Sequence, residues 1–268
     1  MGEDHLQRWL LKTVISIEKR CKCMVDDGGI YEIDLVTEKI ESENPLVIEA
    51  FPGIGLIGSI AGGHIIKELG MKYAGTTTSR FFAPIAMLSD GLVHPPIKIY
   101  EAKEKELIVI YSDIPINPIL SYDLAKVFVD FSVEVNASEI VSIAGILTPS
   151  EGERVFGAAT TEELLERVKK YTEIFSVGTI SGLSGSIMVE CFIRQIPAIG
   201  LIGETHTHAP DPLAASRVIE VINNMYGLEI DVNPLLEEAA RIEAEMEHLA
   251  KQMKLEEQLP AKEFPMYG

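Results

Sequence analysis

Short apolar runs alternate with amphipathic segments along most of the chain, which is typical of strands connected by helices. The run at 46–50 precedes a Phe-Pro-Gly turn and indicates a buried strand. The runs at 97–100 and 107–111 flank a charged turn and predict an antiparallel hairpin. Further strands are expected at 73–77, 140–145 and 198–202, and helices at 5–20, 56–69, 122–135, from 161, at 185–195 and at 212–226. This order predicts an α/β fold with a largely parallel sheet and helices on both faces.

The pattern changes after Gly227, where a long charged helix is expected from Asn233-Pro234 to about residue 259. Its apolar residues recur at alternating spacings of four and three, which is a heptad pattern. They are Leu235, Ala239, Ile242, Met246, Leu249 and Met253. Because the other faces are heavily charged, we expect this helical arm to self-associate along the apolar seam. Packing of the helix on its own domain is the alternative interpretation.

The last three residues, Met266, Tyr267 and Gly268, follow a stiffening Pro265 at the end of this arm. A terminal peptide held away from a domain can enter a pocket of another protein. Met and Tyr would then be apolar anchors, and the terminal carboxylate would be a fixed charge. A frayed chain end without a function is the simpler interpretation, so this pattern needs support from the rest of the sequence.

The balance of acidic and basic residues indicates which kinds of molecule the protein can bind. The 268 residues include 41 acidic and 23 basic side chains, which gives a net charge of −18. A protein that binds nucleic acid needs a basic surface, and the sequence indicates none. The acidity favours a partner with a basic surface instead.

The sequence shows no signal peptide, and the apolar stretch at 9–17 is interrupted by Lys12 and is too short to span a bilayer. Its three cysteines, Cys21, Cys23 and Cys191, lack the spacing of a disulfide framework or a zinc site. We expect them to be reduced thiols in a cytoplasmic protein that does not bind membranes.

Residues 53–58 spell G-x-G-x-x-G between a strand and a helix. A dinucleotide site needs glycines at this turn and an acidic residue at the end of the next strand. Here the next strand runs into three threonines, Ser79 and Arg80, without a carboxylate. We therefore expect the glycines to allow close packing of the helix on the strand.

The segment Gly182-Leu183-Ser184-Gly185-Ser186 resembles a nucleophile elbow but lacks the last glycine of G-x-S-x-G. His206 and His208 follow in the right order to supply a base, although no carboxylate is identifiable as their partner. A tight turn into a helix explains the glycines equally well. No catalytic residue is assigned.

Glu204, His206, His208 and Asp211 include donors that could hold a metal ion. The two histidines are two residues apart and would share one side of an extended segment. A solvated loop before a helix capped by Asp211 is the favoured interpretation, so we expect no metal site.

An ordered set of motifs resembles the proteasome assembly chaperone family, in its archaeal branch. The resemblance covers about residues 29–232. It rests on FPGIGLIG at 51–58, FAP at 82–84, HPPIKIY at 94–100, SDIP at 112–115, GI at 145–146, GLSG at 182–185, GET at 203–205 and PDPLAA at 210–215. The ordered set is far more specific than any one motif.

This resemblance implies a three-layer, nucleoside-phosphorylase-like α/β domain with no established catalytic function and no cofactor. It also implies a homo-oligomer, through the α/β domain and the C-terminal helix, whose arms end in a hydrophobic-tyrosine-any tripeptide. In this chain the tripeptide matches Met266, Tyr267 and Gly268. The resemblance implies that it enters pockets between α-subunits of the 20S proteasome, where the Gly268 carboxylate pairs with a lysine and Tyr267 presses on a gate-forming turn.

We therefore expect an N-terminal extension at 1–28, an α/β domain at 29–232, a helical arm at 233–259 and a flexible tail at 260–268. The leading hypothesis is a non-enzymatic assembly chaperone or ATP-independent activator of the proteasome. A second chaperone subunit stays open as a further partner. The rival hypothesis is an enzyme that processes a nucleoside or nucleotide near Gly53, Ser184 and Glu204, with Arg80 as the only plausible phosphate-binding side chain.

Overall fold

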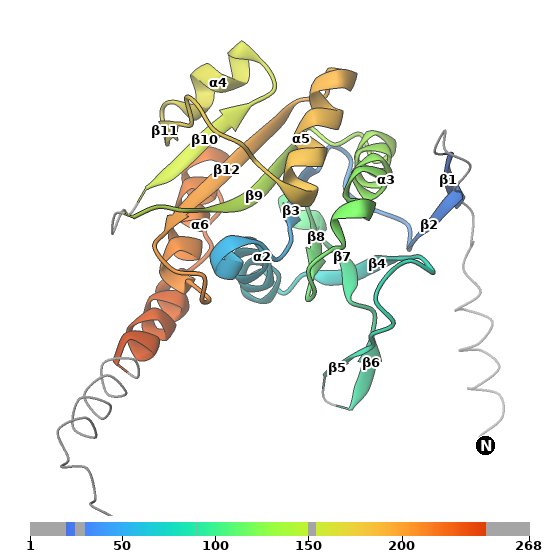
Figure 1. The fold of residues 1–268 in the computed structure, drawn as a ribbon, viewed down its shortest axis with the longest axis horizontal. Helices are drawn as coiled ribbons and strands as arrows, with labels where there is room; N and C mark the ends of the chain where they lie inside the picture. Colours follow the sequence, from blue (N-terminus) through green and yellow to red (C-terminus); the bar gives the residue numbers. More distant parts are fainter. Residues whose placement is uncertain (1–19, 25–29, 90, 150–153, 245–268) are drawn as a thin grey trace, which may run out of the picture.

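The computed structural model describes residues 20–24, 30–89, 91–149 and 154–244 (Figure 1). Its strands are β1 (Arg20–Met24), β2 (Ile30–Thr37), β3 (Leu46–Ala50), β4 (Lys72–Thr78), β5 (Met87–Ser89), β6 (Leu92–His94), β7 (Ile97–Ala102), β8 (Leu107–Ser112), β9 (Glu139–Leu147), β10 (Val155–Ala159), β11 (Glu173–Ile174) and β12 (Ala198–Thr205). Its helices are α2 (Ile57–Glu68), α3 (Ser121–Glu134), α4 (Glu162–Val168), α5 (Gly182–Arg194) and α6 (Pro212–Tyr226), with short 3-10 turns η1 (Ile54–Leu56), η2 (Lys103–Lys105) and η3 (Pro118–Leu120).

Ten of these strands form one sheet in the order β1-β2-β4-β7-β8-β3-β9-β12-β10-β11. The four central strands, β8, β3, β9 and β12, run parallel, as the α/β prediction requires. On one side of this centre, β1, β2, β4, β7 and β8 pair antiparallel in that order; on the other side, β10 is antiparallel to β12. The predicted parallel arrangement therefore forms the centre of a mixed sheet, and β5 and β6 form a separate hairpin.

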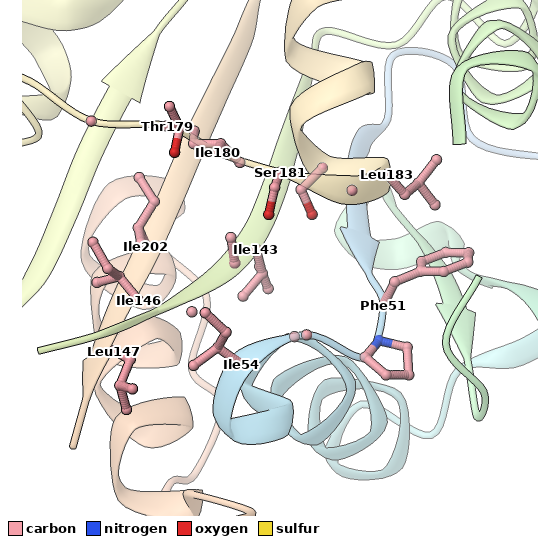
Figure 2. Close-up of a pocket in the computed structure, with 18 of the residues that line it drawn as sticks. Phe51, Ile54, Ile143, Ile146, Leu147, Thr179, Ile180, Ser181, Leu183 and Ile202 are labelled. Carbon is pink, nitrogen blue, oxygen red and sulfur yellow. The ribbon is translucent and has the colours of Figure 1, made fainter. Parts of the chain in front are cut away.

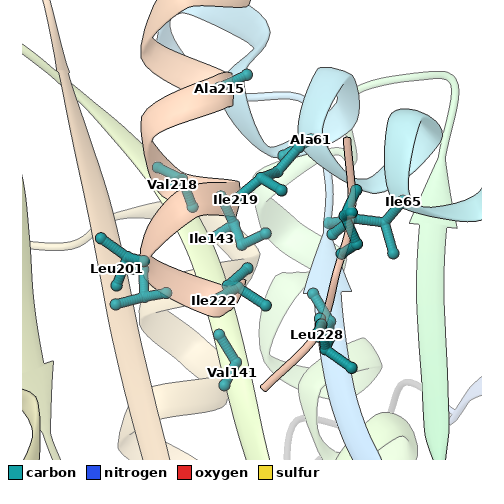
Figure 3. Close-up of a cluster of buried hydrophobic side chains, with 14 of the residues drawn as sticks. Ala61, Ile65, Val141, Ile143, Leu201, Ala215, Val218, Ile219, Ile222 and Leu228 are labelled. Carbon is teal, nitrogen blue, oxygen red and sulfur yellow. The ribbon is translucent and has the colours of Figure 1, made fainter. Parts of the chain in front are cut away.

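Helices cover both faces of the sheet, which confirms the predicted three layers (Figure 1). Side chains alternate along β3: Leu46, Ile48 and Ala50 belong to the core under α2 and α6, whereas Val47 belongs to the core under α3 and α5. Figure 3 shows the first core, in which α2 and α6 pack together over β9 and β12. Each fully buried aliphatic side chain contributes about 1.5–3 kcal/mol, so these two cores hold the layers together.

The predicted helix and strand positions are confirmed within one to three residues wherever the structure describes them. The hairpin of β7 and β8 pairs Ile97 with Ser112 and turns at η2, as predicted. Thr161 caps α4 by accepting a hydrogen bond from the Leu164 backbone. The helix expected at 5–20 falls almost entirely outside the described residues.

Cys191 is a free cysteine that is fully buried in the core under α5. Burial raises the pKa of this thiol to about 12, so it stays protonated and unreactive at neutral pH. The side chains of Cys21 and Cys23 lie outside the described residues. Within the described ranges, no helix combines the length and the apolar character needed to cross a bilayer.

Candidate functional site

A cavity of about 590 Å³ opens at the carboxyl ends of the central strands β3 and β9 (Figure 2). One wall is the chain leaving β3, at 51–54, and the floor is the end of β9, from Ile143 to Leu147. The opposite wall is the loop at 175–181 and the first turn of α5. Open α/β sheets bind ligands at this edge, so this cavity is the candidate ligand-binding site.

The cavity brings two of the sequence motifs together. Gly53, from the G-x-G-x-x-G segment, and Ser184, from the elbow-like segment, both line it, although they lie far apart in the sequence. Glu204 and Arg80 do not line the cavity. The predicted clustering near Gly53, Ser184 and Glu204 is therefore only partly realised.

The glycines after β3 serve local geometry. Gly55 has a left-handed φ of 64°, which favours glycine over other residues. A Cβ at Gly58 would lie 2.5 Å from the Phe51 carbonyl oxygen, so only glycine lets α2 approach the strand this closely. The strand after α2 is β4, and β7 and β8 separate it from β3 in the sheet. A dinucleotide site needs the second strand beside the first, so the packing explanation fits and the dinucleotide site does not.

The cavity lining is uncharged and more apolar than polar. Among the described residues that line it there is no Lys, Arg, His, Asp or Glu; the side-chain hydroxyls come from Thr179, Ser181 and Ser184. Figure 2 shows Ile143, Ile146, Ile180 and Ile202 around the same space. A phosphate group would find no cationic side chain in this lining.

A buried carboxyl group lies directly behind the cavity wall. Glu49 of β3 is 0% exposed and accepts hydrogen bonds from Ser142 of β9 and, at 3.0 Å, from Ser184 of α5. Its second oxygen, Oε1, has no hydrogen-bond partner among the described residues. Burial raises the pKa of Glu49 to about 7, which outweighs the lowering by hydrogen bonds from the two serines and from the Phe51 backbone. This group ties α5 to the centre of the sheet.

The structure does not assemble a catalytic triad. Ser184 lies inside the first turn of α5, and its hydroxyl donates to the Glu49 carboxyl rather than to a histidine. His206 and His208 are exposed on the loop after β12 and do not line the cavity. The geometry therefore fits the interpretation that the glycines around Ser184 allow a tight turn into α5.

Glu204 is a structural ion-pair partner. Its carboxylate accepts two hydrogen bonds from the Arg154 guanidinium, at 2.7 and 3.0 Å, one from the Arg154 backbone N–H at 3.3 Å, and one from Thr148 at 2.8 Å. Asp211 caps α6 by accepting from the Ala214 backbone at 2.9 Å, as the sequence predicted. No group of three or more potential metal ligands occurs among the described residues.

Arg80, the phosphate-binding candidate of the rival hypothesis, is exposed after β4 and lies over the Phe81 ring at 4.8 Å.

In the arm, Leu235 is 8% exposed and belongs to the core under α6, while Ala239 and Ile242 are half-buried on a helix at 233–244. The remaining seam residues, Met246, Leu249 and Met253, and the tripeptide Met266, Tyr267 and Gly268 lie outside the described residues.

Comparison with known proteins identifies the family. The model of the PAC2 family matches residues 47–250, which is most of the chain. The chain belongs to the PAC2 family. A protein of Methanocaldococcus jannaschii without an assigned function is 40% identical over 229 residues, covering 85% of this chain and 95% of its own length.

Two solved structures of proteins from Pyrococcus furiosus share this fold. PbaA, described as an archaeal homologue of proteasome-assembly chaperone, has a TM-score of 0.77 at 33% identity and covers 83% of this chain and 94% of its own. PbaB, described as an archaeal proteasome activator, has a TM-score of 0.73 at 28% identity, with coverages of 81% and 98%. The α/β architecture and the family resemblance seen in the sequence motifs are thereby confirmed.

Sequence reasoning missed Glu49 as part of this site. The signal was present, because a lone acid in the run Leu46–Ala50 interrupts an otherwise apolar strand. A carboxyl group in a fully buried strand must find hydrogen-bond donors, and serines of neighbouring elements are suited to that role. The loop at 175–181 carried no comparable signal.

Proposed function

We propose that this protein is a non-enzymatic assembly chaperone or ATP-independent activator of the 20S proteasome, acting in the cytoplasm as a homo-oligomer. The observation that carries the proposal is the likeness to PbaA and PbaB, each of which matches more than four fifths of the chain. The uncharged cavity at the strand ends also argues against the nucleotide-processing rival, because its described lining offers no cation to a phosphate.

In this proposal the C-terminal residues Met266, Tyr267 and Gly268 dock between α-subunits of the 20S particle. The Tyr267 ring supplies apolar area, and the Gly268 carboxylate makes a charge-assisted contact that fixes the register. The entropy that one short tail loses on binding offsets a large share of its favourable contact energy, so a single tail binds weakly. Several tails held by one oligomer bind through effective concentration, and the apolar seam of the arm would gather them.

The deciding experiment is hydrolysis of a fluorogenic peptide by an archaeal 20S particle, with the full chain and with a form that ends at Pro265. We expect the full chain to stimulate hydrolysis and the shortened form to lose both stimulation and binding. Both forms should unfold at the same temperature, because the described domain is unchanged. Equal binding by the two forms would contradict tail docking, whereas tail-dependent binding without stimulation would assign the assembly role.

A further inference from the structure

The hairpin of β5 and β6 stands away from the rest of the domain (Figure 1). Among the described residues, its two strands pair only with each other, through Met87 with His94, Leu88 with Val93 and Ser89 with Leu92. Leu88, Leu92 and Val93 are 73%, 64% and 71% exposed, although these side chains are typical of a buried sheet face. A single two-stranded hairpin is marginally stable in water, so this one needs a covering surface.

An apolar groove of about 600 Å³ lies at the root of the hairpin. Phe82 and Ala83 line it just before β5 begins, and Ile97 lines it just after β6 ends. The opposite side is the segment 114–118 with Leu120, at the entry to α3. No charged side chain lines the groove among the described residues.

Charge favours a second copy of this chain as the occupant of the groove. Two copies of a chain with a net charge of −18 repel each other, and this repulsion is weakest where charged side chains are sparse. The stretch 81–97, which includes the hairpin and one side of the groove, contains one acidic residue, Asp90, and no Lys or Arg. The exposed apolar side chains of the hairpin and the apolar groove therefore lie together in a part of the chain that has only one acidic residue and no Lys or Arg.

We propose that the hairpin of one copy, carrying Leu88, Leu92 and Val93, inserts into the groove of a second copy. The hairpin does not enter its own groove, since its three apolar side chains are mainly exposed. A two-fold pair or a closed ring would fill every groove once and leave no hairpin uncovered. This inference rests on the proposed homo-oligomer and assigns the surface that builds it.

The test compares two double variants of the full chain by analytical ultracentrifugation over a range of concentrations. Leu88→Ser with Val93→Ser removes two of the exposed apolar side chains of the hairpin. Phe192→Ser with Ile193→Ser removes a similarly exposed apolar pair, 68% and 62% exposed, from the outer face of α5. We expect the hairpin variant to raise the dissociation constant by at least about tenfold, and the α5 variant to keep the wild-type mass.

A second measurement keeps the proposal open to refutation if the hairpin variant folds poorly. Differently tagged copies carrying Val93→Cys and Asn117→Cys should form a mixed disulfide on mild oxidation, because Asn117 lines the groove. A copy with Tyr171→Cys, which is 40% exposed between α4 and the edge strand β11 and does not line the groove, should not cross-link with Asn117→Cys.

Wild-type protein that is monomeric at every concentration would overturn the proposal. Unchanged assembly of a folded hairpin variant, loss of assembly only in the α5 variant, or cross-linking that does not prefer Val93→Cys would overturn it as well. The form that ends at Pro265 keeps the hairpin and the groove, so it should assemble normally. Ultracentrifugation of this form therefore distinguishes a failure of tail docking from a failure of hairpin insertion.

Discussion

Glu49 carries a carboxyl group into a strand whose other side chains are all apolar and buried. Its hydrogen bonds to Ser142 and Ser184 join β3, β9 and the start of α5 at one point. Because Oε1 has no partner among the described residues, the group is poorly compensated when it is ionised. A proton on Glu49 relieves that cost, which is why its pKa lies near 7.

Replacing Glu49 with Gln should change how stability depends on pH. The pKa rises from 4.5 to about 7 on folding, so the folded state binds the extra proton and wild-type stability falls as pH increases between these values. Glu49→Gln cannot ionise and should escape this loss, which is of the order of 3 kcal/mol at full extent. Urea unfolding at pH 5 and pH 8 measures it. A wild-type-to-variant difference that is equal at both pH values would refute a titrating Glu49.

At the scale of elements, the start of the arm belongs to the domain. Leu235 packs into the core formed by α2 and α6, whereas Ala239 and Ile242 are half-buried on the helix that continues to the end of the described residues. The alternative interpretation, a helix packed on its own domain, therefore holds at Leu235. Self-association of the later seam residues stays a prediction.

Substitutions along the arm should separate these two roles. Leu235→Ala should destabilise the domain by about 2–5 kcal/mol, because it empties a core position. Ile242→Asp with Leu249→Asp should leave domain stability unchanged and weaken both self-association and proteasome binding, because charges disrupt an apolar seam. Thermal unfolding, ultracentrifugation and a binding assay on the 20S particle measure these effects. If mass and affinity both survive the double substitution, the seam does not gather the tails.

For the whole molecule, the proposed function depends on presenting several weak contacts at once. The cavity at the strand ends offers apolar walls and hydroxyl groups but no charged side chain among its described lining residues, so no lining side chain can form an ion pair with a phosphate there. The hairpin, the arm and the tail instead point to contacts between proteins. Binding strength would then come from assembly rather than from one deep pocket.

A synthetic peptide of residues 258–268 tests this dependence on assembly. It carries the same C-terminal residues and carboxylate as the full chain but is not held in an oligomer, so it should stimulate the 20S particle only at concentrations at least about a hundredfold higher than the full chain. A peptide of residues 258–265 serves as the control and should have no effect. Stimulation by the longer peptide and the protein at equal concentrations would show that gathering the tails is unnecessary.

The sequence by itself determined the elements and several of their boundaries. The positions of β3, α2, the β7–β8 hairpin, α5 and α6 follow from local periodicity, glycine turns and capping by Thr161 and Asp211. These signals are local, since a helix or strand is favoured by residues within a few positions of one another. The ordered motifs also identified the family.

The tertiary structure alone decided which of these elements meet. Glu49 and Ser184 are 135 residues apart, and only the sheet order brings the end of β3 under α5. The sequence did not indicate the strands β1, β2, β5, β6, β10 and β11, because their pairing depends on partners distant in the chain or on a turn without a strong signal. Burial and hydrogen bonding between distant segments thus created the cavity, paired Glu204 with Arg154 and left the apolar hairpin exposed.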